Sequence, residues 1–313
     1  MRVDASHASK VSVVVPAYNA EATIGAAIES VLAQTYSNLE IVIADDASTD
    51  STAERVQAFD DPRVRLVQAA ANGGEGSARD LAIANATGEW LAVIDADDCW
   101  LPERLEMLLS QVPREGDRWM IVDNIMQCYD VDGELRQWQP LWADGDVPGG
   151  FVDFLALPSH LLKPLFPRRV VTDLNLHHSD SRFGADAEFF IRAIKGANLN
   201  LRFIPTPMYL YRLTTGSMST FVGKHALKRD LLRRLLLELD FSRDETEALK
   251  RHIAVLEEHM RYEPFLTAAR QGQYARALKA LAKDPALVVQ LVRRSPASLR
   301  YRLMLKTEGG NSR

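Results

Sequence analysis

Cysteine, histidine and long apolar runs are scarce in this chain of 313 residues. The 2 cysteines, Cys99 and Cys128, are too few for a disulfide framework or a structural zinc site. No segment approaches the roughly 20 apolar residues that span a bilayer, and residues 1–10 lack the apolar core of a signal peptide. We therefore expect a cytoplasmic protein in a reducing compartment.

The 7 histidines do not follow the spacing of a catalytic zinc site, which places histidines on one face beside a carboxylate base. His177 and His178 are neighbours in a polar loop, and His160 is isolated in the sequence. We expect His160 to be structural, with a place in the wall of a substrate cleft as the alternative.

The chain does have an ordinary globular composition, 47% hydrophobic and 25% charged, which excludes the disordered and low-complexity classes. Its net charge of −5 conceals an asymmetry. Residues 1–100 carry 6 basic and 16 acidic side chains, whereas residues 261–313 carry 11 basic and 3 acidic ones. The acidic front suits a site that holds a metal ion, and the basic tail suits contact with an anionic partner.

The first hundred residues alternate between strand and helix signals. Buried β-branched runs predict strands and amphipathic stripes predict helices. The expected strands are 11–15, 40–44, 64–67 and 90–94, and the expected helices are 23–34, 51–59, 76–86 and one opened by Pro102. This order predicts an α/β fold with a mostly parallel sheet, in which ligands bind beyond the carboxyl ends of the strands.

The remainder of the chain has a less regular pattern. We expect a strand over 119–129 with a turn at residues 132–133, an irregular segment over 139–180 and a helix over 184–196. Prolines divide the last third. Pro205 and Pro207 separate two short expected strands, and the helical pattern from about residue 221 is split by Pro264, Pro285 and Pro296.

An acidic cluster follows the fourth expected strand. Asp95, Asp97 and Asp98 come directly after residues 90–94. Such carboxylates repel one another unless a cation or several donors compensate, and Mg²⁺ and Mn²⁺ take carboxylate and phosphate oxygens. The cluster indicates either a divalent cation site or a capped loop before the next helix.

Two further motifs lie at neighbouring points of the expected sheet. Asp46 follows the strand 40–44, where a carboxylate can accept the imide N–H of a pyrimidine base or form an Asx turn. The glycines of segment 72–79 let a ligand approach the backbone, with Arg79 in reach of a phosphate. The fingerprints of dinucleotide-binding and P-loop proteins are absent from the sequence.

In this order and spacing the motifs resemble those of the family 2 glycosyltransferases, which have a GT-A fold. The matching segments are 13–19 (VVVPAYN), 45–50 (DDASTD), 72–79 (NGGEGSAR) and 88–98 (GEWLAVIDADD). The resemblance is strong over residues 11–110 and weaker over 180–220. It implies a catalytic domain over 1–220, with nucleotide-sugar binding at about 11–110 and the acceptor side at 111–220, followed by a helical region over 221–313.

The resemblance also implies roles for the residues of the donor half. Pro16, Ala17 and Tyr18 are expected to line the nucleotide pocket. Asp46 is expected to bind the base, and Arg79 to lie near the nucleotide. The expected donor is a nucleotide-sugar with UDP as its nucleotide.

The resemblance assigns the chemistry to acidic residues. Asp97 is expected near the ribose or sugar, and Asp98 is expected to hold a divalent cation, Mn²⁺ or Mg²⁺, on the donor diphosphate. Asp186, in a segment similar to the acceptor-side acid motif of the family, is the expected catalytic base, with Glu188 as a substitute. From the residues alone, the favoured interpretation of Asp186 is an N-cap of the expected helix.

A third segment is similar to a loop of the family that closes over the diphosphate. It supplies Arg212 and Ser217 as donor-binding residues. Here the chain departs from the family, because residues 213–215 lack the histidine that often lies between the Arg and the Ser. Asp80 is a smaller departure, since the family often has Asn there.

The resemblance implies an inverting transfer of one sugar to a hydroxyl of a glycan or a lipid-linked saccharide, in bacterial exopolysaccharide biosynthesis of the succinoglycan type. A sugar nucleotidyltransferase and a non-catalytic sugar-nucleotide-binding protein are the alternatives, and nucleic acid is not an expected partner. Residues 285–306 combine apolar and basic side chains, which predicts either peripheral contact with an anionic membrane or packing on the catalytic domain.

Overall fold

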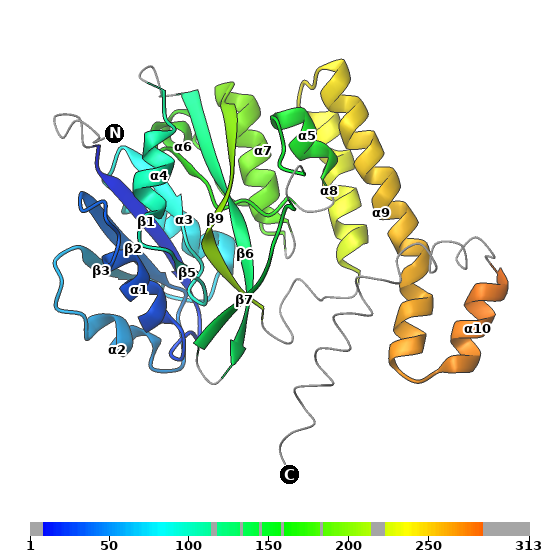
Figure 1. Cartoon of the computed structure of the whole chain (residues 1–313), viewed down its shortest axis with the longest axis horizontal. Coiled ribbons are helices and arrows are strands. Elements are labelled where there is room, and N and C mark those ends of the chain that lie inside the picture. The colour runs from blue at the N-terminus through cyan, green and yellow to red at the C-terminus, as the bar shows by residue number, and fades with distance from the viewer. Residues whose placement is uncertain are drawn as a thin grey trace, which may run out of the picture.

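The computed structural model describes residues 9–113, 118–131, 134–143, 146–157, 160–181, 184–213 and 223–283. Within these residues a central twisted sheet carries helices on both faces, and a group of long helices lies along one side (Figure 1). The arrangement is the α/β fold with a central sheet that the sequence predicts.

The first part of the chain forms parallel strands at the predicted positions. They are β1 (Val11–Ala17), β2 (Leu39–Asp45), β3 (Val64–Gln68) and β4 (Trp90–Val93), in the spatial order β3-β2-β1-β4. The connecting helices are α1 (Ile24–Leu32), α2 (Thr52–Gln57) and α3 (Glu75–Ala84). Parallel pairing brings the carboxyl ends of β1, β2 and β4 to one edge of the sheet, where the acidic motifs follow.

The second part of the sheet contains elements that the sequence pattern did not reveal. β8 (Leu165–Pro167) lies between β4 and β6 (Trp119–Val131) and is antiparallel to both. It falls in the segment that was expected to be irregular, together with α5 (Phe151–Ala156) and α6 (Arg169–Leu174). Elements this short show no clear hydrophobic period, so only their tertiary pairing defines them.

Shorter strands complete the sheet at its far edge. β7 (Glu134–Pro140) is antiparallel to β6, and the expected turn at residues 132–133 lies outside the described residues. β5 (Cys99–Trp100) pairs with β9 (Asn200–Leu213) just before α4 (Arg104–Ser110), the helix expected after Pro102.

β9 runs unbroken through Pro205 and Pro207, so the prediction of two strands separated by these prolines is wrong. It pairs in parallel with β6, and the register shifts beside Asn124. The Asn124 side-chain amide donates to the backbone oxygens of Trp142 (2.8 Å) and Pro205 (3.2 Å). This side chain bridges the irregular pairing that two prolines without N–H groups impose.

The prediction that Pro264 splits a helix is also wrong. α9 (Arg243–Arg270) continues through it, after a capping box in which Ser242 and Glu245 exchange hydrogen bonds. Packing of α8 (Lys224–Glu238) and α10 (Tyr274–Lys283) against α9 supports the helix despite the missing N–H. Pro285 and Pro296 lie outside the described residues.

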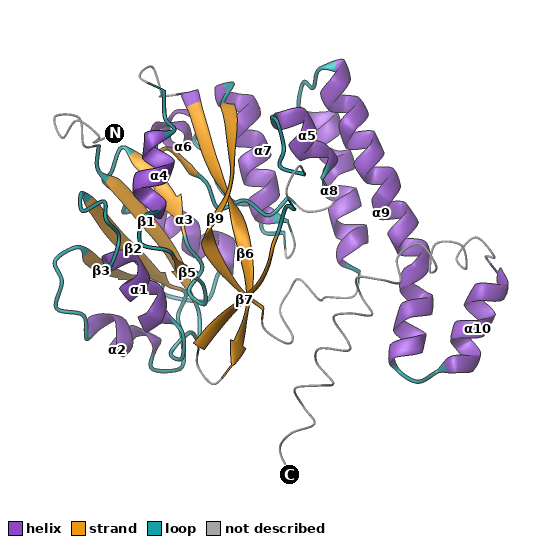
Figure 2. Cartoon of the chain, viewed as in Figure 1, coloured by secondary structure: helices purple, strands orange, loops and turns teal. Residues whose placement is uncertain are grey.

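Side chains of the buried strands alternate between two apolar cores, one on each face of the sheet. Figure 2 shows the helices that cover the two faces. Val13 and Val15 of β1 pack on the face covered by α1 and α4, whereas Val14 packs on the opposite face. The core on the Val14 face continues through α3, α5 and α7 (Ala185–Ala197) to α8 and α9. The long helices therefore share an apolar core with the sheet.

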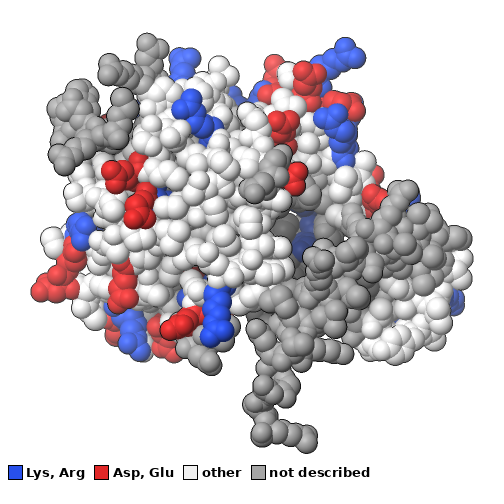
Figure 3. Space-filling view, viewed as in Figure 1, with Lys and Arg blue, Asp and Glu red and all other residues white. Residues whose placement is uncertain are grey.

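None of the described helices has the length and apolar content needed to cross a membrane. The segment 285–306, in which the sequence predicts membrane contact, lies outside the described residues. On the face seen in Figure 3, the basic and acidic side chains of the described residues are interspersed.

Candidate active site

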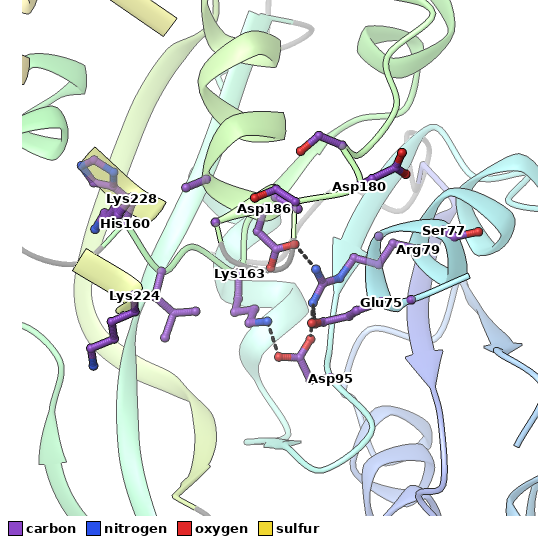
Figure 4. Close-up of a pocket in the computed structure, with 18 of the residues that line it drawn as sticks. Glu75, Ser77, Arg79, Asp95, His160, Lys163, Asp180, Asp186, Lys224 and Lys228 are labelled. Carbon is purple, nitrogen blue, oxygen red and sulfur yellow. Dashed lines mark hydrogen bonds and ion pairs between the residues drawn. The ribbon is translucent and has the colours of Figure 1, made fainter. Parts of the chain in front are cut away.

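A cavity of about 1050 Å³ lies beside the carboxyl ends of the parallel strands (Figure 4). Its walls come from the glycine segment 72–79, from Asp95 after β4, from residues 160–163 and from the helices α7, α8 and α9. Arg79 and Asp186, which the sequence assigned to donor and acceptor sides, both line it. The fold thus joins two motifs that lie more than a hundred residues apart.

Asp46 organises the glycine segment. Its carboxylate oxygens accept the backbone N–H groups of Gly73 and Gly74, both at 2.8 Å, and the residue is 2% exposed. Gly74 has a φ of 88°, a conformation that favours glycine, and it directly precedes α3. The expected contact of Asp46 with a base remains a prediction, whereas its two hydrogen bonds to the glycine segment are present in the structure.

Arg79 is the central cation of the cavity. Its guanidinium is 2% exposed and forms ion pairs with three carboxylates, those of Glu75, Asp95 and Asp186. The Asp95 pair is 2.7 Å long. Although burial lowers the pKa of Arg79, the carboxylates raise it above its ordinary value, so the side chain stays charged.

Lys163 is a site residue that the sequence analysis missed. It is buried, lines the cavity and forms an ion pair with Asp95 (Figure 4). Burial raises the pKa of Asp95, but Lys163 and Arg79 together lower it below the ordinary value. Asp95 is therefore an ionised carboxylate held between two cations. The only signal in the sequence was a lone lysine in an apolar segment.

Asp97 and Asp98 form a second acidic group beside the cavity, next to Asp95. One oxygen of Asp98 accepts the hydroxyl of Tyr209 at 2.6 Å, and the other accepts the backbone N–H of Arg212 at 2.8 Å. Asp98 is 0% exposed, and burial, followed by the charges of Asp95 and Asp97, raises its pKa well above the ordinary value. The side chain of Arg212 donates to the backbone oxygen of Asp97 at 2.7 Å.

This group fits a hard divalent cation. Ligand oxygens of Asp95, Asp97 and Asp98 lie within 4.8 Å of one another. Asp97 makes no side-chain hydrogen bond to another described residue, and burial followed by Asp95 raises its pKa. A divalent cation would relieve the repulsion that raises these pKa values, and the hydrogen bonds of Asp98 fix its carboxylate without using every lone pair.

Asp186 and Glu188 occupy different environments although both lie in the first turn of α7. Asp186 lines the cavity, and Gly184 rather than Asp186 is the N-cap residue of the helix. Glu188 is 3% exposed and accepts hydrogen bonds from Arg192 of α7 and Arg234 of α8. Glu188 therefore links α8 to α7, and of these two acids only Asp186 lines the cavity.

Asp80, the departure from the family pattern, has a specific partner. It accepts the backbone N–H of His178 at 3.0 Å and contacts the Nδ1 atom of the same residue at 2.6 Å. The imidazole stacks on Phe189 with ring centroids 4.1 Å apart, and its Nε2 atom lies 3.9 Å from Asp186. A histidine that the sequence analysis placed in a plain polar loop thus contacts the region of the expected base.

The other expected donor residues lie at the end of β1 or outside the described chain. Pro16 and Ala17 are buried in β1, and the neighbouring Tyr18 is 51% exposed. Ser217 lies outside the described residues. The nucleotide contacts assigned to these residues remain predictions.

The architecture of the chain is the GT-A fold, as comparison with solved structures shows. A crystal structure of TarS from S. aureus in complex with UDP-GlcNAc superposes with a TM-score of 0.63 at 20% identity, covering 87% of this chain and 89% of that one. A mannosyltransferase from Pyrobaculum calidifontis, in complex with GDP-Man and Mn²⁺, gives a TM-score of 0.60 at 19% identity, with 97% and 85% coverage.

Sequence comparison then gives the family. The model of glycosyl transferase family 2 matches residues 12–161, and the chain belongs to this family. The succinoglycan biosynthesis protein ExoO of Rhizobium meliloti is 32% identical over 225 residues, which cover 67% of this chain and 62% of ExoO. ExoU of the same organism is 29% identical over 310 residues, covering 90% of this chain and 85% of ExoU.

A third relative is a glucosyltransferase, WfgD of Escherichia coli. It is named for transfer from UDP-Glc to GlcNAc-diphosphoundecaprenol, and it is 41% identical over 110 residues, covering 35% of this chain and 44% of WfgD. The chain thus spans less than two thirds of the length of ExoO and of WfgD.

Proposed function

We propose that this chain is a metal-dependent, inverting glycosyltransferase that moves one sugar from a nucleotide-sugar, with UDP as the first choice, to a hydroxyl of a glycan or lipid-linked acceptor. The observation that carries the proposal is the single cavity in which Asp186 faces Arg79 and Asp95, beside Asp97 and Asp98. The relatives support exopolysaccharide or cell-surface polysaccharide biosynthesis as the setting.

The residues suit the electrostatics of such a transfer. An acceptor hydroxyl must lose its proton as it attacks, and Asp186 is the carboxylate on the cavity wall that suits this role. Negative charge grows on the departing diphosphate, and Arg79 and Lys163 supply positive charge in the same cavity. A divalent cation on Asp97 and Asp98 would stabilise the same leaving group by its charge. One base and one displacement give inversion at the anomeric carbon.

Titration calorimetry tests the donor site. We expect UDP to bind the wild-type chain at least about tenfold more tightly with Mn²⁺ than without it, and Asp98→Asn to remove that gain. Asp61→Asn is the matched control, because Asp61 forms a surface pair with Arg63 away from the cavity. If UDP, dTDP and GDP all fail to bind with Mn²⁺ present, the proposal of a nucleotide-sugar donor is wrong.

A further inference from the structure

The two ends of the cavity have different chemistry. Figure 4 shows Glu75, Arg79 and Asp95 together at one end, and Lys224, Lys228 and His160 at the other, with Asp186 between the two groups. The acidic motifs of the family therefore account for one end only. The other end is basic, and it is built by a helix that none of these motifs includes.

Lys224 and Lys228 lie one turn apart on α8, so their side chains share a face of the helix. Lys228 is only 9% exposed, and burial, followed by the charge of Lys224, lowers its pKa to about 7. Lys228 is buried and Lys224 is half-buried, so the ammonium groups on this wall lose part of their hydration, which costs free energy. An anion entering the cavity would offset that cost, since it would attract both groups.

The same end of the cavity also has an apolar wall. Leu161, which follows His160, lines the cavity together with Val255 and Leu256 of α9, the helix that packs against α8. Cationic groups next to apolar side chains suit a ligand that carries an anionic group joined to an apolar one. A neutral sugar would leave both features unused.

We propose that Lys224 and Lys228 form a binding subsite for a phosphate or diphosphate group of the acceptor, while the sugar hydroxyl of that acceptor faces Asp186. The apolar group beyond the phosphate lies against Leu161, Val255 and Leu256. The inference rests on the proposed function and narrows it, because it makes the acceptor a phosphate-bearing saccharide. The phosphate can come from a lipid-linked diphosphate or from a soluble phosphorylated saccharide.

The test uses the full chain saturated with UDP and Mn²⁺, so that the donor end is occupied. The probes are an alkyl-diphosphate-linked monosaccharide, the same monosaccharide 1-phosphate and the neutral alkyl glycoside, each titrated by calorimetry. We expect the diphosphate to bind at least about tenfold more tightly than the neutral glycoside, as for a hydrogen bond to a charged group. Lys224→Met, Lys228→Met and the double variant should reduce that difference stepwise.

Lys250→Met is the matched control, since Lys250 is an exposed residue of α9 outside the cavity. Circular dichroism checks that each variant folds, and Lys224→Met keeps the test valid if the more buried position does not tolerate methionine. Tighter binding of the lipid-like diphosphate than of the 1-phosphate identifies a lipid-linked acceptor, and equal binding identifies a soluble one.

Two results would overturn the inference: equal affinity of the wild-type chain for phosphate-bearing and neutral probes, or variants that bind the diphosphate as tightly as Lys250→Met does. Failure of the proposed function is distinguishable. In that case UDP itself does not bind, whereas the phosphate titrations can still be carried out without it.

Discussion

The two ends of the cavity are made from different kinds of sequence. The donor end comes from residues 72–98, where a glycine loop and an acidic cluster follow consecutive elements of a parallel sheet. The opposite end, which the proposal assigns to the acceptor, comes from residues 160–161 and the first turns of α8, segments that lie far apart in the chain, and Lys163 and Asp186 lie between the two ends. At the donor end local sequence sets the chemistry, whereas at the other end tertiary packing does.

The difference predicts where relatives can vary in sequence. Residues that directly follow a parallel strand lie at the carboxyl edge of the sheet, where the ligand binds, and their position does not depend on the helices later in the chain. The acceptor end depends instead on how α8 and α9 pack, so a change in those helices changes what the cavity can hold. We therefore expect the donor end to be shared across the family and the acceptor end to be particular to this chain.

The largest expected effect separates two acids of α7. Asp186→Asn should lower kcat by roughly 100- to 10,000-fold, the range for loss of a general base, while the affinity for UDP changes little. Steady-state kinetics with the identified donor and calorimetry with UDP measure the two quantities. Equal losses in kcat and in UDP affinity would show that Asp186 serves the donor instead.

Glu188→Gln is the matched control, two positions along the same helix. Because Glu188 accepts from Arg192 and Arg234, its loss should lower the free energy of unfolding by about 1–3 kcal/mol and leave kcat nearly unchanged below the melting temperature. Thermal denaturation measures the first effect. A kcat loss as large as that of Asp186→Asn would make Glu188 the base.

The second prediction concerns the lysine at the middle of the cavity. Lys163→Met should destabilise the chain by roughly 3 kcal/mol, because it removes a buried partner of Asp95. Lys195→Met breaks a more exposed pair with Glu245 and should cost less than about 1 kcal/mol. Urea denaturation at pH 7 compares the two, and equal losses would mean that the Lys163 pair contributes no more than a surface one.

The strands of the first hundred residues were predictable because their signals are local. A run such as Val11–Val15 is apolar on both faces, and a strand buried on both faces needs that pattern. β8 was missed, since three residues bounded by a proline have no period and gain their identity from β4 and β6. β9 was misjudged because Asn124 compensates for Pro205, a contact that no local rule contains.

The candidate site divides in the same way. Asp95, Asp97, Asp98 and Asp186 stood out in the sequence, and the fold gathers them around one cavity. Lys228 did not, because α8 carries charged residues on several faces and a lysine there resembles a solvated one. Only the burial of that lysine against α9 and residues 160–161 distinguishes it.

The third prediction tests whether the basic end is maintained at the expense of stability. Lys228 has a pKa of about 7 in the folded chain, against an ordinary value of 10.5, and the nearby His160 and His252 are kept neutral by burial. Between pH 7 and pH 10.5 the unfolded chain binds a proton at Lys228 that the folded chain does not bind. The free-energy cost of burying the charged lysine is therefore complete below pH 7 and vanishes above about pH 10.5. Lys228→Met should therefore be more stable than wild type by an amount on the order of 4 kcal/mol at pH 7.

Denaturation of both proteins at several pH values measures this difference, which should shrink steadily as the pH rises from 7 to 10. Comparing the variant with wild type at each pH cancels the titration of all other groups. A gain in stability combined with loss of phosphate binding is the expected trade-off for a residue kept for function. A pH-independent difference would assign the effect to packing.

The smallest expected effect couples the two ends through Asp80 and His178. The Asp80 carboxylate accepts the backbone N–H of His178 and also contacts its Nδ1 atom. A carboxylate at Nδ1 favours the tautomer with the proton on Nδ1, so Nε2, the nitrogen that faces Asp186, is unprotonated. Asp80→Asn offers an amide donor to Nδ1 instead, which should move the ring proton to Nε2 and toward Asp186. The ¹⁵N chemical shifts of His178 report the tautomer directly.

We expect the exchange of tautomers to change kcat by only about two- to fivefold, because Nε2 lies 3.9 Å from Asp186 and does not bond to it. His178→Phe preserves the stacking on Phe189 and removes both nitrogens, so it isolates the contribution of the ring proton. If Asp80→Asn alters kcat and His178→Phe does not, Asp80 acts through its own helix, α3, and His178 does not transmit the effect to Asp186. If Asp80→Asn shifts the tautomer and both variants alter kcat, α3 helps to set the position of the His178 ring proton that faces Asp186.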